Sequence, residues 1–214
     1  HHMTKKVSDN SRRQFLGGVA ATAGIAAASS FVPTKFAIAG KAPVKVGILL
    51  PYSGTYAMLG NSITNAMKMR LEQAGGVLGG RPIKYIGVDS EMSVPKAAPN
   101  TKKLIDKENV DFLVGPVHSG IAAAMAKIVG SRKTPIMIVP NAGSNAVTGP
   151  LCAPNIFRCS FSNWQPAFPG GKLMADEGAK TAITIAWKYG AGIQMMAAGT
   201  EAFEANGGKV IKDI

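Results

Sequence analysis

Short uncharged runs alternate with amphipathic stretches along most of this chain. The run from Val46 to Leu50 carries no charge and ends at Pro51, which is typical of a parallel strand covered on both faces. From Ile63 onwards apolar residues recur at helical spacing until Gly75-Gly76, which predicts a helix and its end. Ligands of open α/β sheets bind at the carboxyl ends of strands, so the loop over residues 52–60 is the first candidate binding loop.

The same order recurs downstream. Further strands are predicted over 83–88, 110–114 and 135–139, and helices over 93–108 and 121–129. Such alternation favours βαβ units and a parallel sheet. Pro99 should kink the helix it occupies or delay its start.

The glycine-rich stretch 75–80 lacks the spacing and the preceding strand of a dinucleotide loop, and it is interpreted as a helix cap and turn. No helix is predicted directly after residue 139, and residues 153–160 are predicted to be extended. A second βα series then begins. Its predicted members are a helix near 172–177, a strand over 181–187, a helix ending at Ala205 and a strand beginning at Lys209.

Composition narrows the class of protein. The 214 residues suffice for one full domain and part of another, and 46% apolar with 17% charged residues indicates a globular chain. The net charge of +12 is compatible with nucleic acid, a membrane surface or anionic ligands as partners. Beyond Gly40 the basic residues are scattered without an aromatic-interleaved stripe, which favours a solvated surface and no nucleic-acid partner.

Residues 1–39 are interpreted as a tag remnant followed by a signal peptide. His1-His2-Met3 is typical of an expression tag, and Ser11–Leu16 resembles the twin-arginine (Tat) export signal. Ala37-Ile38-Ala39 fits a cleavage site, so the mature chain would begin at Gly40 in the periplasm. The alternative is a membrane anchor, for which the apolar run is short.

The two cysteines, Cys152 and Cys159, lack the spacing of a metal site. They could form a disulfide if the chain folds back between them, or they could be two buried thiols. The sequence leaves both alternatives open.

Five segments carry a resemblance to a known family. In order they are VGILLPYSGTYAMLG, AGGVLGGRPIK, DFLVGPVHSG, PNAGSNAVTG and NIFRCSFSNWQP. They resemble the extracytoplasmic solute-binding proteins of ABC transporters, of the branched-chain amino-acid (Leu/Ile/Val-binding) type. FSNWQP and TIAWKYGAG look most like members that bind aromatic carboxylates.

This resemblance implies the periplasmic-binding-protein type I fold. That fold has two α/β lobes with parallel doubly wound sheets and a ligand cleft between them. Residues 40–161 would be the first lobe and residues 162–214 the start of a second lobe that is incomplete in this chain.

Ser119 and Ser144 lie in the turns after two successive predicted strands. A helix N-terminus with free N–H groups and a hydroxyl suits an anion, although a serine there can be a plain helix cap and one in a turn a plain turn residue. The resemblance implies that both serines and the backbone near Ala142 hold the ligand's carboxylate. The full set of candidate ligand-binding residues is Tyr56, Leu59, His118, Ser119, Gly120, Asn141, Ala142, Ser144, Trp164 and Tyr189.

The other candidates are assigned mainly by the resemblance. Leu59 matches a position that packs on the ligand side chain, and Tyr189 matches a tyrosine that closes the cleft from the second lobe. Trp164 fits either the pocket or the core. His118 beside Ser119 suggests a hydrolase, but no G-x-S-x-G motif occurs, and one histidine cannot build a usual zinc site.

We therefore expect a periplasmic receptor, not an enzyme, that captures a small carboxylate-bearing ligand and delivers it to an ABC permease in the inner membrane. The ligand would be a branched-chain amino acid or an aromatic acid. No cofactor is expected, because the sequence contains neither a phosphate loop nor a metal cluster. The alternatives are a Tat-exported α/β enzyme and a sensor domain of the same fold that feeds a signalling partner.

Overall fold

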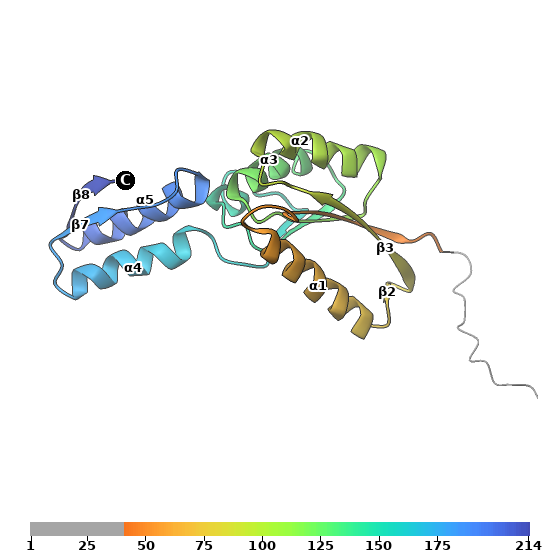
Figure 1. Ribbon diagram of the computed structural model, residues 1–214, viewed down its shortest axis with the longest axis horizontal. Coiled ribbons are helices and arrows are strands. Elements are labelled where there is room, and N and C mark those ends of the chain that lie inside the picture. Colours follow the sequence, from red (N-terminus) through yellow and green to blue (C-terminus); the bar gives the residue numbers. More distant parts are fainter. Residues whose placement is uncertain (1–40) are drawn as a thin grey trace, which may run out of the picture. The chain divides into compact units, whose positions relative to one another are not determined.

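The computed structural model describes residues 41–214 (Figure 1). The predicted tag remnant, export signal and cleavage site lie outside the described residues. In chain order the elements are β1 (Val44–Leu50), α1 (Ala57–Gln73), β2 (Val77–Leu78), β3 (Arg81–Asp89), α2 (Val94–Lys102), the π-helical turn η1 (Lys103–Lys107), β4 (Phe112–Val114), α3 (Ser119–Val129), β5 (Ile136–Val139), the 3-10 turn η2 (Asn145–Thr148), β6 (Ile156–Arg158), α4 (Trp164–Asp176), β7 (Thr181–Thr184), α5 (Gly190–Ala205) and β8 (Lys209–Asp213).

Six strands form one sheet in the order β2-β3-β1-β4-β5-β6. Every neighbouring pair is parallel except the short β2–β3 hairpin. The predicted parallel α/β sheet is therefore confirmed. Because the strands are parallel, β1, β3, β4 and β5 end at the same edge, and the loops that follow them meet there.

Both faces of this sheet are covered, with α1 on one face and α2 and α3 on the other (Figure 1). Side chains alternate across β1 accordingly. Leu49 packs into the core beside α3, whereas Ile48 and Leu50 pack toward α1. All three are at most 2% exposed, and full burial of such a side chain stabilises a fold by about 1.5–3 kcal/mol.

A second, two-stranded sheet pairs β7 and β8 in parallel, and α4 packs along α5. The two helices approach closely at Gly171, where a Cβ atom would lie 2.0 Å from the carbonyl oxygen of Gly199. Phe203 of α5 is fully buried in this part of the chain. The predicted second βα series is thus present.

The structure corrects the bounds of that series. Helix α4 begins at Trp164 rather than near residue 172. Pro166 lies in the first turn, where a missing N–H costs nothing, and Pro169 lies inside the helix. Strand β7 ends at Thr184 rather than at residue 187.

Helix α2 also begins earlier than Pro99 would suggest, since it starts at Val94 and continues through the proline. Regular α-helical geometry ends at Lys102, and η1 follows as a single π-helical turn. The predicted disturbance therefore lies at the end of the helix and not at its start.

Two short strands were missed. Val77-Leu78, which we interpreted as part of a turn, pairs antiparallel with β3. The segment predicted only as extended supplies β6 at the edge of the six-stranded sheet. A 3-10 turn, η2, follows β5 where no helix was predicted.

The disulfide between Cys152 and Cys159 is not present: both thiols are free, and both are exposed. The alternative of two buried thiols is equally wrong. Strand β6 runs between the two cysteines, and a strand of three residues extends about 10 Å, beyond the Cα separation that a disulfide spans.

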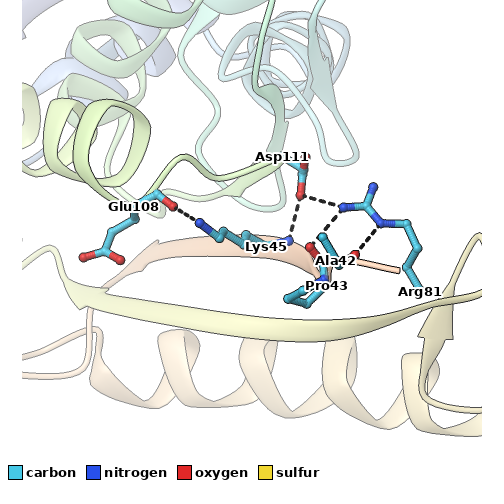
Figure 2. Close-up of polar contacts among 6 residues, drawn as sticks. All are labelled: Ala42, Pro43, Lys45, Arg81, Glu108 and Asp111. Atoms are coloured by element: carbon cyan, nitrogen blue, oxygen red, sulfur yellow. Dashed lines mark hydrogen bonds and ion pairs between the residues drawn. The ribbon is translucent and has the colours of Figure 1, made fainter. Parts of the chain in front are cut away.

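The amino ends of the strands are tied together by polar contacts (Figure 2). Arg81 Nε donates to the Ala42 carbonyl oxygen at 2.7 Å, and its Nη2 donates to the Pro43 carbonyl oxygen at 3.0 Å. The Asp111 carboxylate accepts from the backbone N–H of Lys45 at 2.8 Å. These contacts join the starts of β1, β3 and β4 at the edge opposite the candidate binding loops.

None of the helices within residues 41–214 combines the length and the hydrophobicity that a membrane span requires.

We expect Gly60→Ala to lower the free energy of unfolding by about 1–3 kcal/mol. The added Cβ would lie 1.8 Å from the carbonyl oxygen of Pro51, at the point where α1 meets the end of β1. Gly170→Ala in α4 is the matched control, because its Cβ meets nothing within 4 Å and alanine favours a helix. Denaturant unfolding of both variants is the measurement, and equal effects would contradict this account.

Candidate ligand-binding site

A cavity of about 160 Å³ lies at the carboxyl ends of β1, β4 and β5. Six of the ten predicted site residues line it, and four do not. The lining residues are Tyr56, Leu59, Val117, His118, Ser119, Asn141, Gly143, Phe161, Asn163, Tyr189, Ala191 and Met195.

Three larger cavities lie away from it, of about 510 Å³ at the amino ends of the strands, about 520 Å³ beside α4 and α5, and about 430 Å³ beside α5 and β8. None of the three is lined by the loops that follow β1, β4 and β5. We place the site at the smaller cavity, because polar groups that follow the ends of β1, β4 and β5 converge there.

The first binding loop is held in place by Asp89 at the end of β3. Its Oδ1 accepts from the backbone N–H of Tyr52 at 2.9 Å and from that of Glu91 at 2.8 Å. Burial by itself would raise the pKa of Asp89, but hydrogen bonds from Tyr52, Ser53 and Glu91 outweigh it, and the pKa is lowered. The sequence marked Asp89 only as a strand end, so this anchoring role was missed.

Helix α3 presents its N-terminus to the cavity. His118 is the N-cap residue, and its Nδ1 accepts from the backbone N–H of Gly120 at 3.0 Å. Ser119, the first helical residue, is 3% exposed. The remaining first-turn N–H groups and the positive end of the helix dipole make this a favourable place for an anion.

The His118 side chain is neutral at physiological pH. Burial lowers its pKa, and the bond accepted by Nδ1 places the ring proton on Nε2. The ring packs against Tyr189, with 5.0 Å between the ring centroids. Burial, followed by the neighbouring Tyr56, raises the pKa of Tyr189, so this tyrosine also stays uncharged.

An adjoining cavity of about 210 Å³ shares three of these aromatic residues. Trp187 lines it and contacts Tyr56, with 6.4 Å between the ring centroids. Trp187 belongs to the TIAWKYGAG segment, in which no role was predicted for it.

Asn163 is the most connected polar residue of the site, and it was also missed. It is 2% exposed, and its Nδ2 donates to Ser119 Oγ at 3.2 Å and to Gln194 Oε1 at 2.8 Å. Gln194 Oε1 also accepts from the backbone N–H of Asn145 at 3.0 Å. The only sequence signal was the position of Asn163 beside Trp164 in the quoted FSNWQP motif.

Four predicted residues lie outside the cavity lining. Ser144 is buried beside η2, and its carbonyl oxygen accepts from Arg158 Nη1 at 2.7 Å. Trp164 is 41% exposed and stacks on Phe168. The other two are Ala142, which is fully buried in the core, and Gly120, which lies beside the His118 ring.

The chain matches the family model described as periplasmic binding protein over residues 43–214. It is 47% identical to the solute-binding protein of an ABC transporter from R. palustris solved in complex with benzoate. That match has a TM-score of 0.77 and covers 81% of this chain and 48% of the other.

Two further matches are more distant. A solute-binding protein from Rhodopseudomonas palustris BisB5, in complex with 3,4-dihydroxybenzoic acid, is 29% identical with a TM-score of 0.73, covering 80% and 47% of the two chains. The Leu/Ile/Val-binding protein homolog 6 of Brucella abortus (strain 2308) is 30% identical over 80% of this chain and 43% of the relative. The chain thus spans just under half the length of each of these proteins.

We expect the contribution of His118 to the free energy of unfolding to be constant above about pH 6.5. This contribution should fall as the pH drops from about 6.5 to the folded-state pKa of His118. The reason is that the unfolded chain binds a proton at a higher pH than the buried imidazole does. An NMR titration of the ring should show a midpoint below 6.5. His118→Asn keeps a helix-capping side chain and should remove this component, whereas a midpoint above 6.5 would contradict the assignment.

Proposed function

Since the chain belongs to the periplasmic binding protein family, we propose that it is the ligand-capturing part of an ABC uptake system for a small carboxylate-bearing solute. The observation that carries this proposal is the N-terminus of α3, with the buried Ser119 hydroxyl, at an aromatic-lined cavity. A carboxylate only accepts hydrogen bonds, so it needs several donors when it leaves water. The Ser119 hydroxyl and the first-turn N–H groups supply donors without a buried cation.

An aromatic carboxylate suits this cavity better than a branched-chain amino acid. Tyr56, Phe161 and Tyr189 offer flat apolar surfaces, and the lining contributed by residues 41–214 contains no carboxylate that would pair with an ammonium group. The small volume suits a compact ring. The benzoate bound by the 47% identical protein from R. palustris supports the same class of ligand.

In this proposal the protein works in the periplasm and delivers its ligand to an ABC permease of the inner membrane. Residues 1–39 would direct twin-arginine export and be removed near Ala39. Residues 40–161 would form the first lobe and residues 162–214 part of the second, with the ligand held between them. Closure of two lobes about a hinge would be the working step.

We expect benzoate to bind the full-length protein more tightly than leucine and more tightly than benzamide. Benzamide keeps the ring but replaces one acceptor oxygen with a donor, so it mismatches a site made of donors. Isothermal titration calorimetry with the three compounds is the measurement. Tighter binding of leucine would contradict the aromatic class, and equal binding of benzamide would contradict the carboxylate site.

We expect Ser119→Ala to weaken benzoate binding by roughly ten- to a hundredfold, because a hydrogen bond to a charged group contributes about 1.5–3 kcal/mol. Ser131→Ala is the matched control: this exposed serine lies just beyond the other end of α3, and its hydroxyl donates to the Ile128 carbonyl oxygen. Calorimetry should show unchanged affinity for the control. Unchanged affinity for Ser119→Ala would reduce Ser119 to a structural residue.

A further inference from the structure

We propose that Asn163 and Gln194 are positioning residues that direct the hydroxyl proton of Ser119 into the cavity. This inference rests on the proposed function, because it concerns how the same site recognises a carboxylate. It adds two residues that would not touch the ligand's carboxylate and would act through Ser119.

The direction of the network is fixed by a backbone group. The N–H of Asn145 can only donate, and it points at Gln194 Oε1 at 3.0 Å, so that atom must be an acceptor. Asn163 lies 2.8 Å from the same oxygen and must therefore present its amide nitrogen to it. The second proton of that nitrogen is directed at Ser119 Oγ at 3.2 Å.

Asn163 cannot easily turn its amide over. Its backbone N–H donates to the Gly143 carbonyl oxygen at 2.7 Å, and the side chain is almost fully buried. Its Oδ1 fits against Gly143 so closely that a Cβ atom there would lie 2.1 Å away. The orientation that donates to Ser119 is thus held by contacts on both sides of the amide.

The consequence for Ser119 follows from the capacity of a hydroxyl, which donates once and accepts twice. Among the described residues 41–214, Asn163 is the one hydrogen-bond partner of Ser119 Oγ, and it uses an acceptor site. The hydroxyl proton is therefore left for the cavity that Ser119 lines. A carboxylate oxygen of a ligand can accept that proton.

The test is a double-mutant cycle on the full-length protein, with benzoate as the probe and calorimetry as the readout. Asn163→Leu removes both donated bonds at similar volume and should weaken benzoate binding by about tenfold when Ser119 is present. In the Ser119→Ala background the same change should alter affinity by less than about twofold. Gln194 is a partly exposed residue of α5. Gln194→Leu should weaken benzoate binding by about three- to tenfold and show the same dependence on Ser119. This variant replaces Asn163→Leu in the cycle if Asn163→Leu fails to fold.

Preference for acid over amide is the second readout, because loss of cavity shape alone would weaken both ligands alike. The ratio of benzoate to benzamide affinity should fall in Asn163→Leu and Gln194→Leu. Equal losses of benzoate affinity with and without Ser119 would overturn this inference, and so would an unchanged ratio of benzoate to benzamide affinity. Either result would leave the proposed function standing. Failure of the unaltered protein to bind benzoate would overturn the proposed function and this inference together.

Discussion

The burial of β1 is the constraint on which the rest of this structure depends. From Val46 to Leu50 the strand carries only apolar residues on both faces. Such a segment is stable only where helices cover both sides of the sheet, which requires crossover connections and parallel neighbours. Leu49 on one face and Leu50 on the other are fully buried, and helices from different parts of the chain cover them. Parallel order in turn brings the loops after β1, β3, β4 and β5 to a single edge. The site is therefore a geometric result of how the central strand is covered.

At that edge, backbone atoms and short polar side chains hold the loops in position. Asp89 fixes the loop after β1 through backbone N–H groups, and the Ala142 N–H donates to the Pro116 carbonyl oxygen, which joins the loops after β4 and β5. Asn163 then connects this edge to α5 through Gln194. Each bond is worth only about 1 kcal/mol to stability, but leaving a buried partner unpaired costs more, so the network specifies one arrangement.

The order of strands and helices could be predicted from the sequence, because apolar periodicity reports burial directly. The type I periplasmic-binding-protein fold class is confirmed by the solved structures that the chain matches. Helix starts were less predictable. Helix α4 begins at Trp164 although Pro166 follows closely, because a proline in a first turn loses no hydrogen bond. Six candidate site residues lie together because each follows a strand end. Asn163 and Gln194 could not be found in this way, since their role depends on contacts between residues 31 positions apart that carry no local pattern.

The absence of a charged side chain from the cavity lining of the described residues has a consequence for affinity. An ion pair would attract an anion at long range and hold it whether or not the donors around it are aligned. Neutral donors act only at short range and only when they point at the ligand. His118 stays neutral because of its burial, so the carboxylate of the proposed ligand would depend on the α3 N-terminus and on the Ser119 hydroxyl. In the network proposed above, the orientation of that hydroxyl depends on Gln194, a residue of α5. Under the proposed function, binding strength would thereby be coupled to whether α5 is seated against the first sheet, which is what a receptor that both retains and releases a solute requires.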